Sequence, residues 1–343
     1  MTSHTSEKPK SHRARAAAAA AAAAAIRLCP WAMLDADETA ALAMEVAAAQ
    51  RDILIDPAVL RCGASAGIQN EGYEYFNERL GAPNVWEVDV EFDVVQEAAA
   101  LFNGARLRHA HESMAGKRGA AVQSFSGGGA SFALVQPKGW SSDVNWFSAD
   151  DEATMARFGS IFDRLGLASL FAPVVGHEHT LRMFSALFVV RTECTSANVH
   201  SDWTDAVGTN ALTLITPLTE CAADQNGGFQ LLYEGRSHAA GGGESGKHLQ
   251  QYTYTCGKAI VFGAGFRHST EPGRAASASE PQAFLCLTFG TDKLEMWPAI
   301  ANKGLRDQSR LLTRPDGSLE KTGLGVHVAD NSLSFIRQAM AAM

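Results

Sequence analysis

Apolar residues change their spacing along this chain, from helical in the first half to strand-like in the second. The stretch 35–51 starts with Asp35 and carries Glu38 three residues later, which predicts a capped helix. Helical spacing also predicts helices over 92–104, ended by Gly104, and over 149–166, ended by another glycine. Between them, 121–137 predicts two strands around a Gly-rich turn.

From residue 180 onward, short runs rich in Val, Leu, Phe, Thr and Tyr dominate the chain. They read TLRMFSALFVVRTE, NALTLITPL, GFQLLY, QQYTYT, KAIVFG and AFLCLTFG. Short strands without helices between them predict a sandwich or barrel. The C-terminal NSLSFIRQAMAAM has helical spacing and predicts a helix packed on the core. The fold expected is therefore α+β, with a helical N-terminal layer over a jelly-roll core.

Residues 1–25 differ in composition from the rest, because a basic Ser/Thr-bearing segment runs into a stretch of alanines. One interpretation is an organelle transit peptide, and the other is a low-complexity, disordered tail. We expect residues 26–343 to form a single domain with its core at about 180–292, since no internal repeat or linker divides them.

Composition and charge narrow the function classes. The chain has 343 residues, of which 46% are hydrophobic and 19% charged, as in globular proteins with a sizeable core. Its net charge of −8 disfavours nucleic-acid binding, although a local basic groove would not show in this figure. Six scattered cysteines without a C-x-x-C pair predict reduced thiols, and no apolar run predicts a membrane span. A soluble, cytoplasmic protein is expected unless the tail directs it to an organelle; the oligomeric state stays open.

The strongest candidate chemistry is a metal site made of His200, Asp202 and His268. His200 and Asp202 form an H-x-D pair after one β-type run, and His268 follows another run, KAIVFGAGFR. Two histidines and one carboxylate on a rigid β scaffold are the ligands of a facial Fe(II) site, which leaves positions open for a cosubstrate and O₂. The alternative is a polar turn pair and an ordinary buried histidine, in which case the chain would be a metal-free jelly-roll binding protein.

The segments VHSDW, TLITPL, GGFQLLY, AIVFGAGFRHSTEPG and FLCLTFGTD resemble the double-stranded β-helix core of the Fe(II)- and 2-oxoglutarate-dependent dioxygenases. The resemblance implies iron held by His200, Asp202 and His268. It also implies decarboxylation of 2-oxoglutarate to succinate and hydroxylation of a small-molecule substrate.

This chain departs from the family pattern at the cosubstrate anchor. The family commonly places an Arg or Lys shortly after the distal histidine, near the next strand, but the approach here reads ASASEPQAF. Two arginines can substitute, because a single guanidinium can hold a carboxylate bidentately. Arg274 on the loop after His268 is the first choice, and Arg191 at the end of the strand before His200 is the second.

The missing arginine keeps a second resemblance open, to the TET-type DNA dioxygenases and an algal branch associated with ascorbate. In that reading the chain oxidises modified DNA bases, ascorbate replaces 2-oxoglutarate, and Asp205 matches a further aspartate of the branch. Asp205 can equally be a turn cap.

Other motifs are weaker. HAH at 109–111 and HEH at 177–179 are expected to be surface or packing histidines, and GGGESGKH (241–248) to be a loop rather than a phosphate-binding motif. Trp203 and Phe266 are candidates to line a substrate pocket, as are Trp140 and Trp146.

Overall fold

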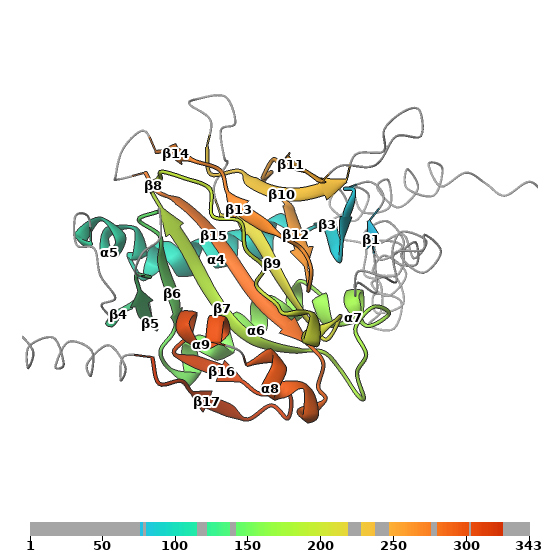
Figure 1. Cartoon of the computed structure of the whole chain (residues 1–343). Helices are drawn as coiled ribbons and strands as arrows, with labels where there is room; N and C mark the ends of the chain where they lie inside the picture. Colours follow the sequence, from blue (N-terminus) through green and yellow to red (C-terminus); the bar gives the residue numbers. More distant parts are fainter. Residues whose placement is uncertain are drawn as a thin grey trace, which may run out of the picture. The chain divides into compact units, whose positions relative to one another are not determined.

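The computed structural model describes residues 76–77, 80–114, 122–137, 142–218, 228–236, 247–275, 280–301 and 303–324 (Figure 1). All of them belong to one compact unit, Leu60–Met343. The tail at 1–25, the helix expected over 35–51, the C-terminal helix and Trp140 lie outside the described residues. The domain boundary at residue 26 stays a prediction.

The described elements follow one another along the chain as helices and strands first, then mostly strands. The helices are α4 (Phe92–Gly104), α5 (Leu107–Ser113), α6 (Glu152–Arg164), α7 (Leu167–Phe171), α8 (Trp297–Ile300) and α9 (Lys303–Gln308), with 3₁₀ turns η3 (Asp205–Val207) and η4 (Leu294–Met296). The strands before residue 180 are β1 (Phe76–Asn77), β2 (Ala82–Pro83), β3 (Val85–Asp89), β4 (Val122–Gly127), β5 (Ala130–Val135) and β6 (Asn145–Ala149). The later strands are β7 (Arg182–Arg191), β8 (Glu193–Cys194), β9 (Ala211–Pro217), β10 (Leu231–Arg236), β11 (Lys247–Tyr252), β12 (Lys258–Phe262), β13 (His268–Thr270), β14 (Gly273–Arg274), β15 (Gln282–Gly290), β16 (Leu311–Thr313) and β17 (Leu319–Lys321).

The strand order is that of a double-stranded β-helix. The large antiparallel sheet runs β3-β12-β9-β15-β7-β6-β5-β4, and a smaller sheet runs β11-β10-β13. From β7 onward the chain crosses repeatedly between the large sheet and the strands that face it. Strands β7, β9, β12 and β15 belong to the large sheet. Strands β10, β11 and β13 form the smaller sheet, and β8 pairs with β14. The predicted jelly-roll core is confirmed by this pairing.

Helices α4 and α6 cover the outer face of the large sheet, as Figure 1 shows behind β7 and β15. The aromatic ring of Phe188 on β7 contacts Phe102 of α4 and Phe158 of α6, with ring centroids 5.4 and 5.2 Å apart. Side chains alternate along a strand, so the neighbours of Phe188 on β7, Leu187 and Val189, face the smaller sheet instead. The helical layer expected from the sequence is thus confirmed.

Helix α6 begins where the sequence indicates. Asp151 is the N-cap, and its Oδ1 accepts a hydrogen bond from the backbone N–H of Thr154 at 2.7 Å. The chain leaves the helix through Gly166, whose φ of +64° suits glycine.

The C-terminal elements α8, α9, β16 and β17 gather at one end of the large sheet, drawn in red in Figure 1. They pack on Phe184 of β7 through Trp297, Ile300, Leu305 and Leu312. The sequence patterns did not predict this segment, nor strands β3 and β6, because each is only three to six residues long.

The described residues bear on the expectations of reduced cysteines and of no membrane-spanning helix. Cys194, Cys256 and Cys286 carry free thiols. Within the same residues no helix is both long and apolar enough to cross a bilayer.

Candidate functional site

His200 and His268 are joined through their backbones in an isolated bridge beside β13, an outer strand of the smaller sheet. The N–H of each residue donates to the carbonyl oxygen of the other, at 2.9 Å in both directions. Their imidazole centroids are 4.7 Å apart. The two predicted ligands, distant in sequence, are therefore fixed in register by the sheet itself.

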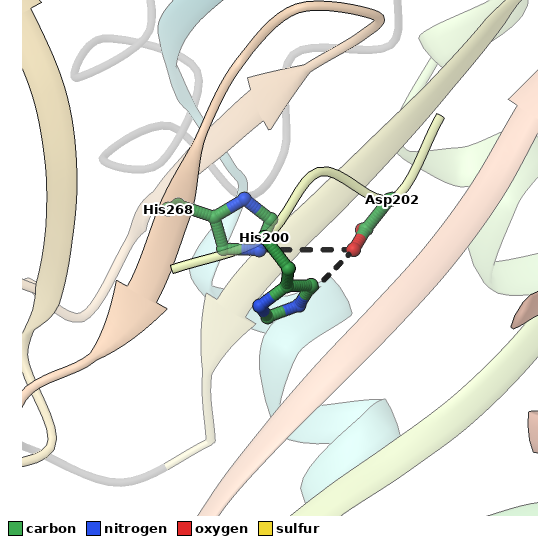
Figure 2. Close-up of side chains that lie close together, drawn as sticks. All are labelled: His200, Asp202 and His268. Atoms are coloured by element: carbon green, nitrogen blue, oxygen red, sulfur yellow. Dashed lines mark ion pairs between the residues drawn. The ribbon is translucent and has the colours of Figure 1, made fainter. Parts of the chain in front are cut away.

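Asp202 completes a cluster of three ligand groups, and Figure 2 shows its carboxylate directed at both histidines. Oδ1 of Asp202 lies 3.6 Å from Nε2 of His200 and 3.7 Å from Nε2 of His268. One ligand atom from each residue lies within 4.8 Å of the others. The sequence-predicted triad is thus brought together, and it is the metal-type cluster that the described residues contain.

Each histidine presents Nε2 to the cluster because Nδ1 points at a backbone carbonyl. Nδ1 of His200 lies 2.8 Å from the oxygen of Asn198, and Nδ1 of His268 lies 3.4 Å from the oxygen of Phe266. A carbonyl only accepts, so Nδ1 carries the proton and the Nε2 lone pair is left for a ligand bond.

His268 is held in the neutral form that binds metals. Burial lowers its pKa to about 4, against the opposing charge of Asp202. The ring of Phe266 stacks on His268 with centroids 5.6 Å apart. Phe266 is itself buried and lies outside the set of described residues that line the cavity, so it supports a ligand instead of forming a pocket wall.

The carboxylate of Asp202 is oriented by a short hydrogen-bonded chain. Oγ1 of Thr213 on β9 donates to Oδ2 of Asp202 at 3.1 Å, and the indole N–H of Trp203 donates to Thr213 Oγ1 at 3.1 Å. Oδ1 therefore stays directed at the histidines. Trp203 is buried in the core with Phe184 and Trp297, so its place is behind the site.

The donor set fits a divalent iron ion. Two cis ligand atoms with bonds of about 2.1 Å to one ion lie about 3 Å apart, so the two N–O separations, 3.6 and 3.7 Å, have only about 0.7 Å to close around a bound ion. Two neutral imidazoles and one carboxylate leave the remaining positions open toward the cavity, as in non-haem Fe(II) oxygenases. The thiol of Cys286 also faces this cavity, but burial raises its pKa and keeps it from competing as a thiolate.

A cavity between the two sheets opens beside the triad. Its walls are mostly apolar side chains on the inner faces of the strands: Trp146, Leu187, Val189, Ile215, Phe229, Leu231, Phe284 and Cys286. Its polar lining, apart from the triad, consists of Arg191, Tyr254, Thr270 and Gln308. Of the four aromatic residues predicted to line the pocket, Trp146 lies on the cavity wall, Trp203 and Phe266 do not, and Trp140 is outside the described residues.

Arg191 is the charged side chain of this lining outside the triad. Its Nη1 donates to Oγ1 of Thr270, while its Nε is buried and has no hydrogen-bond partner among the described residues. Burial lowers the pKa of Arg191, partly offset by Tyr254 and Asp143 nearby, and an arginine remains protonated even so. A buried, unpaired guanidinium N–H facing a cavity is suited to an anionic ligand.

Arg274 and Asp205 lie away from the triad. Arg274 is exposed over 76% of its side chain and pairs with Glu193 across β14 and β8. Asp205 is exposed at the start of the 3₁₀ turn η3 and is not part of the ligand cluster.

The histidines of the HAH and HEH motifs make contacts away from the metal-type cluster. His109 is exposed and pairs with Glu112, whereas His111 is buried beside Asn145 and Asp143. In the HEH motif, the backbone N–H groups of Glu178 and His179 donate to the carboxylate of Asp292. In GGGESGKH only Lys247 and His248 are described, at the start of β11.

Sequence reasoning missed several residues of the cavity. Thr270 could have been found, because it follows His268 by two residues and alternation places both on one face. Tyr254 lies in an irregular segment and Gln308 ends the short helix α9, and the pattern of neither stretch carries such a signal.

Comparisons with known proteins give structural likenesses. No family model and no curated protein matches the chain. The non-heme alpha ketoglutarate dependent epimerase SnoN from nogalamycin biosynthesis has 14% identity and a TM-score of 0.37, covering 69% of this chain and 85% of that one. A Pseudomonas putida prolyl-4-hydroxylase has 16% identity and a TM-score of 0.35, covering 61% and 92%. HygX from Streptomyces hygroscopicus, solved with nickel and 2-oxoglutarate bound, has 12% identity and a TM-score of 0.36, covering 62% and 84%. At such identities and TM-scores these likenesses do not establish the activity of this chain, whose function has to come from its own residues.

Proposed function

We propose that this protein is a non-haem Fe(II)- and 2-oxoglutarate-dependent dioxygenase that hydroxylates a small molecule. The observation that carries the proposal is the pairing, in one cavity, of a His200–Asp202–His268 triad with the buried, unpaired Nε of Arg191. Bound Fe(II), with 2-oxoglutarate and O₂, supplies oxidation of a substrate C–H bond together with decarboxylation of the cosubstrate to succinate.

The protein's residues hold the metal on one side and leave the other open. The bridged backbones of His200 and His268 fix two ligands, and Thr213 turns Asp202 toward them. Apolar walls line the cavity beside the triad, so a substrate bound there displaces water and strengthens the electrostatic contacts inside.

Arg191 replaces Arg274 as the proposed anchor for the distal carboxylate of 2-oxoglutarate. Arg191 lines the cavity with Thr270 and Tyr254, two further donors from other segments, whereas Arg274 is exposed. The pairing of β7 with β15 gives the distance along the strand from Arg191 to the triad. Arg191 is opposite Gln282, whereas Leu187 is opposite Cys286, whose pKa is raised by burial and by the charge of Asp202. Four residues of strand cover about 13 Å, a span that an arginine side chain and a short dicarboxylate can bridge.

The substrate is proposed to bind beyond the metal from Arg191. Gln308 lines the cavity near the end of β7 that is opposite to Arg191. Its neighbour Ser309 is held there, because the hydroxyl groups of Ser309 and Ser185 are hydrogen-bonded. Trp146 offers an apolar ring on the same wall. An amide and an indole suit a small molecule with an apolar body and one hydrogen-bonding group.

The first experiment is anaerobic. Purified protein is loaded with Fe(II), 2-oxoglutarate is added, and the visible charge-transfer band of a bidentate keto acid on iron is recorded. The band is expected in the native protein and in Arg274→Ala, and lost or shifted to far higher cosubstrate concentration in Arg191→Met. Arg267→Ala serves as a surface control, because Arg267 is paired with Glu234 outside the cavity.

Three results would count against the proposal. If the protein binds iron but shows no charge-transfer band with 2-oxoglutarate, the 2-oxoglutarate assignment is wrong. Ascorbate would then be tested as the cosubstrate, in the native protein and in Asp205→Asn. Loss of the band in Arg274→Ala instead of Arg191→Met returns the anchor to Arg274. Full function in His200→Ala would favour a metal-free binding protein.

A further inference from the structure

The backbone that directly follows Arg191 is held by a single carboxylate. Oδ1 of Asp143 accepts from the N–H groups of Thr192 and Glu193, each at 2.8 Å. Oδ2 of Asp143 accepts from the hydroxyl of Thr192. We call Asp143 with Thr192 and Glu193 the Asp143 clamp.

Bonds in the opposite direction close the clamp. The N–H of Asp143 donates to the carbonyl of Glu193 at 3.1 Å, and the hydroxyl of Ser142 donates to the same carbonyl at 2.7 Å. Residues 142–143 thus hold the chain from one side where β7 ends, while β14 pairs with Glu193 and Cys194 from the other side.

A buried histidine ties the clamp to helix α5. Nε2 of His111 lies 3.6 Å from Oδ2 of Asp143, and Nδ1 of His111 lies 2.6 Å from Nδ2 of Asn145. Burial by itself would raise the pKa of Asp143, but the hydrogen bonds from His111, Thr192 and Glu193 lower it to about 2. The carboxylate is therefore ionised wherever the protein is folded near neutral pH.

Arg191 depends on its backbone for its direction. Its side chain has one hydrogen bond, to Thr270, and its Nε is unpaired in the described part of the chain. Arg191 is the last residue of β7, so the direction of its Cα–Cβ bond follows the backbone at 191–193, and a shift of that backbone moves a guanidinium that has few contacts of its own.

We infer that Asp143 is a positioning residue for the carboxylate anchor, fixing Arg191 so that its guanidinium meets a dicarboxylate in the cavity. This inference rests on the proposed use of Arg191 as that anchor. Among the described residues Asp143 belongs neither to the ligand cluster nor to the cavity lining, so its effect is exerted through Arg191.

The direction in which removal of Asp143 changes anion binding distinguishes a positioning role from a purely electrostatic one. Asp143 acts on Arg191 as a nearby negative charge. If charge were its whole role, removing it would tighten the binding of an anion to Arg191. If it positions Arg191, removing it loosens that binding, since a misplaced guanidinium loses bidentate geometry.

The test uses Asp143→Asn, which keeps the shape but turns one acceptor into a donor facing other donors. Glutarate is titrated into metal-free protein by calorimetry, and the Fe(II) protein is titrated with 2-oxoglutarate and with pyruvate, which lacks a distal carboxylate. Binding of glutarate and of 2-oxoglutarate is expected to weaken on the order of tenfold, whereas binding of pyruvate stays as in the native protein.

Two further variants guard against general disturbance. Asp292→Asn removes a carboxylate that also accepts three backbone N–H groups, but on a loop away from the cavity, and should leave glutarate binding unchanged. Thr192→Val removes only the hydroxyl contact of the clamp and should weaken glutarate binding less than Asp143→Asn, in the same direction.

The outcomes distinguish this inference from the proposed function. Unchanged or tighter glutarate binding in Asp143→Asn, equal weakening of pyruvate, or no glutarate binding by the native protein each overturns the positioning role. Weakened glutarate binding in a protein that shows no keto-acid band with iron supports the clamp and removes the dioxygenase proposal.

Discussion

Thr213→Val tests whether the site is organised by the chain from Trp203 through Thr213 to Asp202. Valine keeps the shape of threonine but removes the hydroxyl, so the indole N–H loses its acceptor and Oδ2 of Asp202 loses a donor. Both Thr213 and Trp203 are buried, 1% and 3% exposed, so water cannot replace the acceptor at the indole.

The magnitude follows from these two losses. A buried N–H left without a partner costs about 1–3 kcal/mol. Asp202 retains a quarter of its side-chain exposure, so water can take over part of the donor's role there and adds about 1 kcal/mol or less. We expect the free energy of unfolding to fall by about 1–4 kcal/mol and the affinity for Fe(II) to fall on the order of tenfold.

Urea unfolding of the metal-free protein measures the first quantity, and anaerobic calorimetric titration with Fe(II) measures the second. Thr213→Ser keeps a hydroxyl and should retain most of both. In a Trp203→Phe background the same valine change should cost less, because no indole N–H is left to be orphaned. A Thr213→Val protein as stable as the native one, with native Fe(II) affinity, would refute the role of this chain.

Three further predictions concern the scaffold. Phe188→Ala should lower the free energy of unfolding by about 3–5 kcal/mol in urea titration, because Phe188 is fully buried between sheet and helices, whereas Phe92→Ala, 63% exposed, should change it by less than about 0.5 kcal/mol. Asp292→Asn should reduce stability fully above about pH 4 and progressively less as the pH falls toward 2: burial opposes ionisation, but the N–H groups of 178–180 lower the pKa of Asp292 from its ordinary value of 3.8 to about 2, so its contribution is lost between these two values. Acid titrations of both proteins that differ equally at pH 2 and pH 6 would contradict this. Chelation of bound metal should leave the far-ultraviolet circular dichroism unchanged, since backbone bonds already hold the two ligand histidines; unfolding on chelation would show that the metal makes the site.

The fold was predictable where long runs carry a clear period. The strand β7 and the helix α4 each span ten residues or more, so a run of β-type residues identified the first and helical spacing the second. The short strands β3 and β6 were missed because their few residues carry no usable period, and both are fixed by pairing with distant strands.

The site was predictable in its ligands and less so in its surroundings. An H-x-D pair and a distal histidine each end a β-type run, so the triad could be inferred from order and residue type. Choosing between Arg274 and Arg191 needed three dimensions, because only pairing shows that Arg191 stands opposite Gln282 on the inner face while Arg274 faces Glu193 and solvent.

The strand order also determines when the site can form during synthesis. Strand β7 finds its neighbour β15 only after almost a hundred further residues have been added, and β3 waits for β12. Such non-local pairing makes folding slow and leaves unpaired strand edges exposed meanwhile. His200 acquires its partner only when His268 has left the ribosome, so a nascent chain cannot load metal until its core is nearly complete. If the chain takes iron as proposed, it takes it only at this late stage of its synthesis.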